Sequence, residues 1–168
     1  MIDFFHKGAA MTKRISGIAK IKGAPEVKSR PLRKISRIGI FQDEEDDVAS
    51  ILLEVADTPD ARQHGLMGRK SLPSVCGMLF EGLSGGGYFW MKNCLIPLDI
   101  AFMDKDGSIT KICSMKADDG EEHYEYDENV ASAVETAKGF FKRNGIKEGF
   151  KLKTRKLGKG DDNVNGTS

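Results

Sequence analysis

Charge along this chain is separated into blocks, and this separation limits where a hydrophobic core can form. Residues 1–40 carry ten lysines and arginines against two acids. Their few large apolar residues keep neither a helical nor a strand period for long, so this block cannot bury much surface by itself. Residues 41–60 carry eight acids and no base. The part that can fold is therefore expected at about residues 48–154.

This pattern predicts one domain with an appendage at each end. We expect a basic extended arm at residues 1–45, a β-rich globular domain at 46–156 and a polar flexible tail at 157–168. A chain of 168 residues suits one domain of ordinary size and is too short for two packed side by side.

Composition excludes several classes of protein. No apolar run approaches the roughly 18 residues that a membrane span needs. Three cysteines, an odd number without a close pair, do not form a disulfide framework. His6 and Lys7 interrupt the only apolar patch near the start, so no export signal is expected. We therefore expect a cytoplasmic protein, or one incorporated in a virus particle, and no membrane partner.

Apolar patterns in the central region predict a β-rich α+β domain. Asp57-Thr58-Pro59 is typical of a helix start, and this short helix is expected to run to Arg69. Asp106-Gly107 is a strong hairpin signal. Helical turns are expected at residues 139–144, before Gly145. Strands are predicted at residues 51–55, 77–80, 88–92, 98–103, 108–115, 130–134 and 150–154. A helix is not excluded at 130–134.

Several ordered motifs lie between residues 62 and 100. They are Arg62-x-x-Gly65-Leu66-Met67-x-Arg69, Leu72-Pro73, Gly77-Met78-Leu79-Phe80, Phe89-Trp90-Met91-Lys92-Asn93 and Ile96-Pro97-Leu98-Asp99-Ile100. In this order and spacing they resemble the domain-of-unknown-function family 192, over about residues 48–154. The resemblance implies a compact, barrel-like antiparallel sheet with one or two short helices, and it implies no activity.

The chain departs from the family pattern at two positions. Cys94 stands where relatives usually have threonine, and Phe150 stands where an acidic residue often follows the glycine. If the threonine hydroxyl belongs to a site in this family, that site is changed here.

The candidate ligand-binding residues are an aromatic ring, an ammonium, an amide and two carboxyl groups. They are Trp90, Lys92, Asn93, Asp99 and Glu135. On a strand Trp90 and Lys92 would share one face, which suits an anionic or planar small ligand. Alternatively Lys92 pairs with one of the carboxylates, because buried polar groups need partners, and the cluster is structural.

No metal site or catalytic residue is predicted. His6, His64 and His123 are widely spaced, without a zinc-binding pattern. Cys76-x-Met78 and Cys113-x-Met115 place soft atoms on one strand face, which suits Cu(I), but both residue types are also common core fillers. No cysteine has a spacing that places a histidine beside it, and no nucleophile-elbow or phosphate-loop motif is present. No cofactor is expected.

The basic arm is the remaining functional signal. It could dock on other protein subunits, make nonspecific contacts with nucleic acid through residues 1–40, or stay solvated. The candidate contact residues are Lys13, Arg14, Lys20, Lys22, Lys28, Arg30, Arg33, Lys34 and Arg37.

Together these features favour a non-catalytic binding or scaffold domain that docks into a larger assembly through its arm. One setting is an accessory structural component of a virus particle. The alternative is a small-molecule-binding or hydrolytic domain that uses the Trp90, Lys92, Asn93 and Asp99 cluster.

Overall fold

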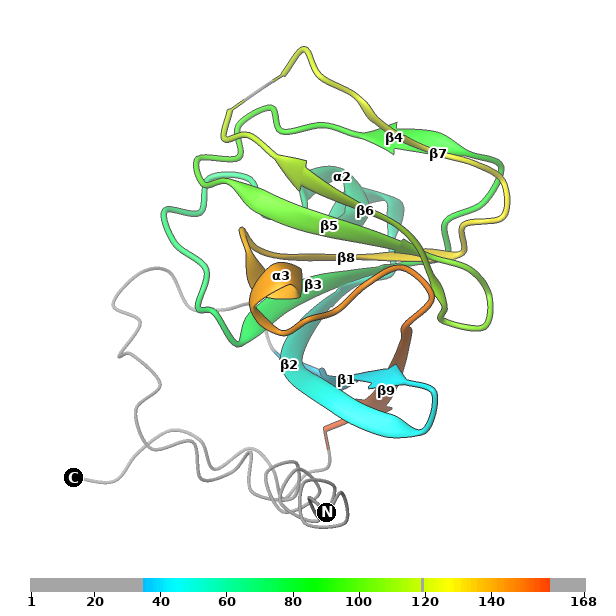
Figure 1. Ribbon diagram of the computed structural model, residues 1–168. Coiled ribbons are helices and arrows are strands. Elements are labelled where there is room, and N and C mark those ends of the chain that lie inside the picture. The colour runs from blue at the N-terminus through cyan, green and yellow to red at the C-terminus, as the bar shows by residue number, and fades with distance from the viewer. Residues whose placement is uncertain (1–34, 119, 158–168) are drawn as a thin grey trace, which may run out of the picture.

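A seven-stranded mixed sheet and a two-stranded ribbon account for the strands of the described chain. The computed structural model describes residues 35–118 and 120–157. The sheet has the order β6-β5-β8-β3-β2-β1-β9, and β4 pairs with β7 in the ribbon, which lies at the top of Figure 1. The strands are β1 Arg37–Asp43, β2 Asp46–Ala56, β3 Cys76–Glu81, β4 Gly87–Phe89, β5 Leu98–Met103, β6 Ile109–Met115, β7 Tyr124–Tyr126, β8 Ser132–Ala137 and β9 Lys151–Lys156. The β-rich α+β class is confirmed.

Strand β1 corrects the boundary expected at residue 45. It lies between β2 and β9 and pairs antiparallel with both. Ile38 and Phe41 are buried in spite of the polar residues around them, with exposed fractions of 2% and 0%. The net charge of residues 1–40 did not reveal these two apolar positions. Because β1 is part of the sheet, the folded domain includes residues 37–43 and does not begin at residue 46. Residues 1–34 of the predicted arm lie outside the described residues, as do residues 158–168 of the predicted tail.

Strands β2 and β3 run parallel, which corrects the expectation of a wholly antiparallel sheet. A parallel pair needs a crossover connection, and here it contains helix α2, Pro59–His64. The predicted start is confirmed, because the Ala61 amide donates to the Thr58 hydroxyl at 3.2 Å. The helix ends at Gly65, where φ is +47°, earlier than the run to Arg69 that the sequence suggested.

The hairpin signal at Asp106-Gly107 is also confirmed. It joins β5 and β6, and Gly107 has φ +77° in the turn. Residues 132–137 form a strand, β8, between β5 and β3, so the helical alternative at 130–134 is wrong. Helix α3, Phe140–Arg143, occupies the predicted helical turns before Gly145.

The two faces of the sheet bury two separate cores. One core contains Met78, Ile100 and Phe102, and is covered by α2, the segment after it and the β4–β7 ribbon. The other contains Val134, Ala101 and the α3 side chains Phe140 and Phe141, which pack on Phe41 with ring centroids 5.8 and 5.9 Å away. We call these the ribbon face and the α3 face. Figure 1 shows α3 in front of the sheet and the ribbon above it.

The sheet curls but is not closed into a barrel. Its edge strands β6 and β9 approach each other at one corner, where Ser108 and Lys151 form an isolated bridge. There the Ile109 amide donates to the Phe150 carbonyl at 2.8 Å, and the Leu152 amide donates to the Gly107 carbonyl at 2.9 Å. The resemblance to a barrel is therefore limited to this curvature.

Candidate functional site

A pocket of about 240 Å³ opens on the ribbon face of the sheet. Helix α2 and the turn after it form one wall, β3 and β8 form the floor, and β4 with β7 forms the opposite wall. Aromatic side chains contribute much of its lining: Phe80, Tyr88, Phe89, Trp90 and Tyr126.

Glu135 is the acidic residue of the lining. It lies on β8 opposite Ile100 of β5, and its side chain is on the ribbon face because strand side chains alternate. It is 4% exposed, and its Oε2 atom has no hydrogen-bond partner among the described residues. Burial raises the pKa of the Glu135 carboxyl to about 8. The group is therefore mostly protonated near neutral pH.

The aromatic walls are held by contacts between rings. Phe89 meets Phe80 edge to face with centroids 4.9 Å apart, and contacts Phe102 and Tyr126 at 5.7 and 5.8 Å. Such packing fixes the ring positions, so the pocket has a shape before any ligand enters.

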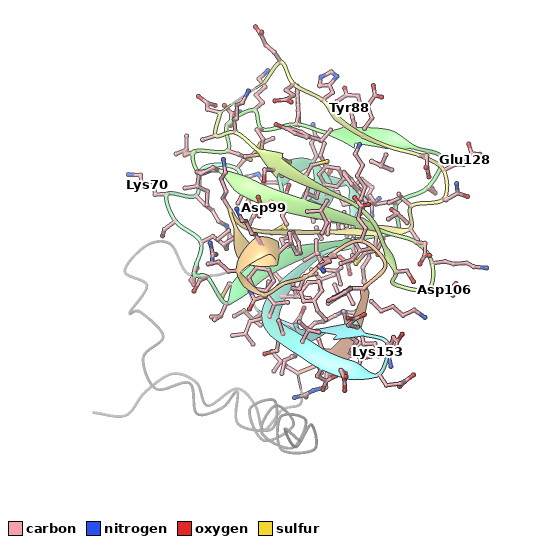
Figure 2. The ribbon with its side chains drawn as sticks, viewed as in Figure 1. Lys70, Tyr88, Asp99, Asp106, Glu128 and Lys153 are labelled. Atoms are coloured by element: carbon pink, nitrogen blue, oxygen red, sulfur yellow. The ribbon has the colours of Figure 1, made fainter. Side chains whose placement is uncertain are left out.

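The mouth of the pocket exposes two large aromatic side chains. Tyr88 is 54% exposed and stacks on His123 with ring centroids 4.0 Å apart. Trp90 is 36% exposed, and the Lys92 ammonium lies 5.3 Å from its ring centroid. Figure 2 shows Tyr88 on the ribbon side of the molecule, at the top of the view.

The guanidinium group of Arg62, which lines the pocket, is held by two backbone carbonyl groups. Arg62 Nη1 donates to the Asp57 carbonyl at 3.1 Å and to the Glu81 carbonyl at 2.9 Å. These two bonds join the start of α2 to the end of β3, so Arg62 helps to hold the pocket wall.

Cys94 also lines the pocket. Burial raises the pKa of the Cys94 thiol to about 12, and the charges of Glu135 and Asp118 add to the effect. A thiol with this pKa is neutral at physiological pH and is a weak nucleophile. Cys94, at which the resemblance led us to expect a threonine, therefore belongs to the pocket wall.

The structure brings two of the predicted ligand-binding residues, Trp90 and Glu135, together in this pocket. It does not bring the other three into the lining. Strand β4 ends at Phe89, so the strand expected through Lys92 is wrong, and Lys92 instead lies over the Trp90 ring. The backbone N–H of Asn93 donates to the Asp118 carboxylate at 3.1 Å.

Asp99 lies on the opposite face of the sheet. It pairs with Thr136, one residue from Glu135, so its side chain is on the α3 face. It accepts hydrogen bonds of 2.7 Å from the Ser114 hydroxyl and from the Gly139 amide. Figure 2 shows it beside α3. Asp99 therefore holds the start of α3 and the end of β6, and it is not part of the candidate site.

One of the predicted partner-contact residues lies in the described part of the chain. Arg37 lies on β1 and forms an ion pair with Glu81 at 3.0 Å, so its charge is used within the domain. The other eight, Lys13, Arg14, Lys20, Lys22, Lys28, Arg30, Arg33 and Lys34, lie outside the described residues.

Sequence reasoning missed most of the pocket wall. Arg62 and Phe89 belong to the ordered motifs between residues 62 and 100, but nothing in their spacing predicted that they would line a pocket. Tyr126 lies in an acidic stretch, and its three-residue strand was not predicted. Its alternation with Tyr124 was the available signal.

The described part of the chain holds no group of three or more histidine, cysteine, aspartate or glutamate side chains suited to a metal ion. Within the same residues, no helix is both long and apolar enough to cross a membrane.

The model of the family DUF192, described as "Uncharacterized ACR", matches residues 40–154. No curated protein is similar enough in sequence to count as a match.

Two crystal structures are similar to this chain in fold. One, from Sinorhizobium meliloti 1021, is described as a "putative transcription regulator"; it has 30% sequence identity and a TM-score of 0.65, and the match covers 71% of this chain and 92% of that one. The other, from Novosphingobium aromaticivorans DSM 12444, is described as a protein of unknown function. It has 25% identity and a TM-score of 0.66, and the match covers 79% of this chain and 97% of that one.

Proposed function

We propose that this chain, which belongs to the uncharacterized family DUF192, binds a small organic molecule in the pocket above Glu135. One observation carries the proposal: a carboxyl group is buried at the pocket, and its Oε2 atom has no partner in the described residues. An unpartnered buried polar group costs on the order of 1–3 kcal/mol, and a ligand that hydrogen-bonds to it offsets that cost.

A second buried glutamate on the same face makes the contrast clear. Glu54 of β2 and Glu135 of β8 both lie beside Met78 of β3, one on each side. Glu54 is held by Arg69 through two hydrogen bonds of 2.5 and 2.6 Å. The fold thus supplies a fixed partner to Glu54, whereas Glu135, which lines the pocket, keeps one carboxyl oxygen without a partner among the described residues.

Binding is favoured over covalent catalysis by the state of the nearby nucleophile. Hydrolysis through a covalent intermediate needs an activated nucleophile beside a base. The Cys94 thiol is neutral at physiological pH, because its pKa is raised to about 12. The pocket therefore supports recognition of a ligand, with Trp90 at its mouth and Glu135 at its floor.

Docking through the basic arm, into a virus particle or another assembly, depends on residues outside the described part of the chain. It stays a prediction, as do the protein and nucleic-acid partners assigned to that arm. A binding domain with a pocket is compatible with either setting.

Trp90 provides the experiment, because it is the single tryptophan of the chain and lines the pocket. A panel of small molecules is screened by tryptophan emission and by the shift in melting temperature. We expect at least one compound to change both, and Glu135→Leu to weaken its binding by about tenfold or more. Glu128→Leu, at an exposed position, is the matched control and should bind as the wild type does.

The proposal fails if every compound that raises the melting temperature leaves Trp90 emission unchanged. It also fails if such compounds bind Glu135→Leu as tightly as the control.

A further inference from the structure

We infer that the ligand of this pocket is a small primary ammonium compound whose cationic head donates hydrogen bonds to Glu135 while its apolar part lies against the aromatic walls. This inference rests on the proposed function and adds the chemical class of the ligand.

The charge of the floor points to a cation. Glu135 is the acidic side chain of the lining, and in its ionised form the carboxyl group can only accept hydrogen bonds. Its Oε2 atom therefore lacks a donor. A primary ammonium supplies three donors and the opposite charge in one small group, which a neutral hydroxyl does not. Burying an ionised carboxylate costs desolvation free energy, and an ion pair with a bound ammonium offsets part of that cost.

The walls favour the same class. Aromatic faces attract cations, and tryptophan does so most strongly. One cation is already placed this way at the mouth, where the Lys92 ammonium lies 5.3 Å from the Trp90 ring centroid. The rings of Phe89 and Tyr126 continue the aromatic surface inward from this point. An alkyl or aryl chain fits between such rings, and its ammonium head then reaches the floor.

An anionic ligand, which the sequence suggested from Lys92, fits less well. Lys92 is outside the lining, and Arg62 is committed to the carbonyls of Asp57 and Glu81. An anion that reached the floor would meet a neutral Glu135 carboxyl below about pH 8 and a repelling carboxylate above it, so neither form of Glu135 neutralises the charge of the anion. Trp90 and Glu135 are the two predicted ligand-binding residues that line the pocket. They favour a ligand with a positive charge, whereas the sequence suggested a negative one.

The size of the pocket limits the ligand. Its volume of about 240 Å³ lies below the roughly 300–1,000 Å³ of pockets that hold drug-sized molecules. We therefore expect a ligand of about ten non-hydrogen atoms or fewer.

Binding of an ammonium compound is coupled to a proton. In the free protein near neutral pH the Glu135 carboxyl is mostly protonated. When the cation binds, the O–H bond breaks, the proton goes to the buffer and the carboxylate pairs with the ammonium. The other titratable or charged side chains of the lining are Arg62 and His64 from the α2 segment, Tyr88 from β4, Cys94, and Tyr126 from β7.

The test uses two probes of nearly the same shape, n-pentylammonium and 1-pentanol, with the full chain at pH 7.5. Affinity is measured from Trp90 emission and by calorimetry in two buffers of different ionisation enthalpy. We expect the ammonium to bind wild type about tenfold or more tightly than the alcohol, and to release protons. Glu135→Gln should remove this preference and the proton release, while Glu128→Gln should keep both.

Equal affinity for the two probes would overturn the ammonium inference and leave the proposed function standing. If neither probe binds, the inference is also overturned, and the wider panel decides the proposed function separately. Should Glu135→Gln fail to fold, the wild type alone decides: ammonium affinity must rise between pH 6 and pH 8 with proton release, and a flat profile overturns the inference.

Discussion

Glu135 is a residue whose protonation differs between the folded and unfolded chain. Its ordinary pKa of 4.5 is raised to about 8 in the fold, and burial is the cause. Between these two values the folded state holds a proton that the unfolded state has lost. Stability is therefore linked to pH through this side chain.

We expect the free energy of unfolding to fall as pH rises from about 4.5 to about 8, because the folded state binds more protons across this window. Below the window the carboxyl is protonated in both states, and above it the carboxyl is ionised in both. The slope should reach at most about 1.4 kcal/mol per pH unit. Urea unfolding of wild type and Glu135→Gln, measured from pH 4.5 to 9, isolates this term: the difference between the two should change only inside the window. Parallel curves would contradict the prediction.

The sequence identified Trp90 and Glu135 as candidate ligand-binding residues, but it placed Asp99 in the same cluster. The register of β5 against β8 separates the two carboxyl groups, since Asp99 pairs with Thr136 and Ile100 pairs with Glu135. A shift of one residue changes the face on which every side chain lies. Register depends on pairing between distant strands, so residue types near Asp99 could not predict it.

Strand β3 forms part of the site. It carries Phe80 of the pocket wall and pairs with β8 beside Glu135. Gly77 allows this approach: a Cβ built there would lie 2.5 Å from the Glu135 carbonyl oxygen and 3.0 Å from the Ile51 side chain. The obstacle includes backbone, which cannot move without disturbing the sheet.

Gly77→Ala should therefore destabilise the protein by about 1–3 kcal/mol, the usual cost of overpacking a core. Gly120→Ala is the matched control, because its Cβ would meet Lys92 at an ordinary 3.5 Å. That control should change stability by no more than about 0.5 kcal/mol. Chemical denaturation of the three proteins checks the prediction, and equal midpoints for both variants would contradict it.

Local signals predicted the elements that local chemistry controls. Thr58 caps α2, and Asp106-Gly107 turns β5 into β6, because side-chain capping and a positive φ act within a few residues. The short strands β4 and β7 were mispredicted or missed. Their three-residue length is set by the pairing of Gly87–Phe89 with Tyr124–Tyr126, which are far apart in sequence.

For the whole molecule, the decisive feature is the membership of β1 in the sheet. Phe41 is fully buried and contacts both α3 phenylalanines. The strand also connects β9, the last strand of the described residues, to β2. Residues that the charge pattern placed in an arm thus hold the two ends of the domain together.

We expect Phe41→Ala to cost about 3–5 kcal/mol, because it removes a large buried side chain from between β1 and α3. Ile40→Ala, at a half-buried position on the other face of the same strand, should cost less. Thermal melts of the full-length variants measure both. If residues 37–43 belonged to an extended arm, neither substitution would change the melting temperature.

Sequence alone determined the family, the β-rich class, most strand positions, the two turn and cap signals, and two of the residues at the pocket. Each of these depends on residue order or on chemistry within a few positions. Only the tertiary structure decided that β1 lies inside the sheet, that β2 and β3 are parallel, and that Glu135 faces a pocket while Asp99 supports α3. These depend on which distant strands pair and in which register, and that choice is made by burial across the whole sheet.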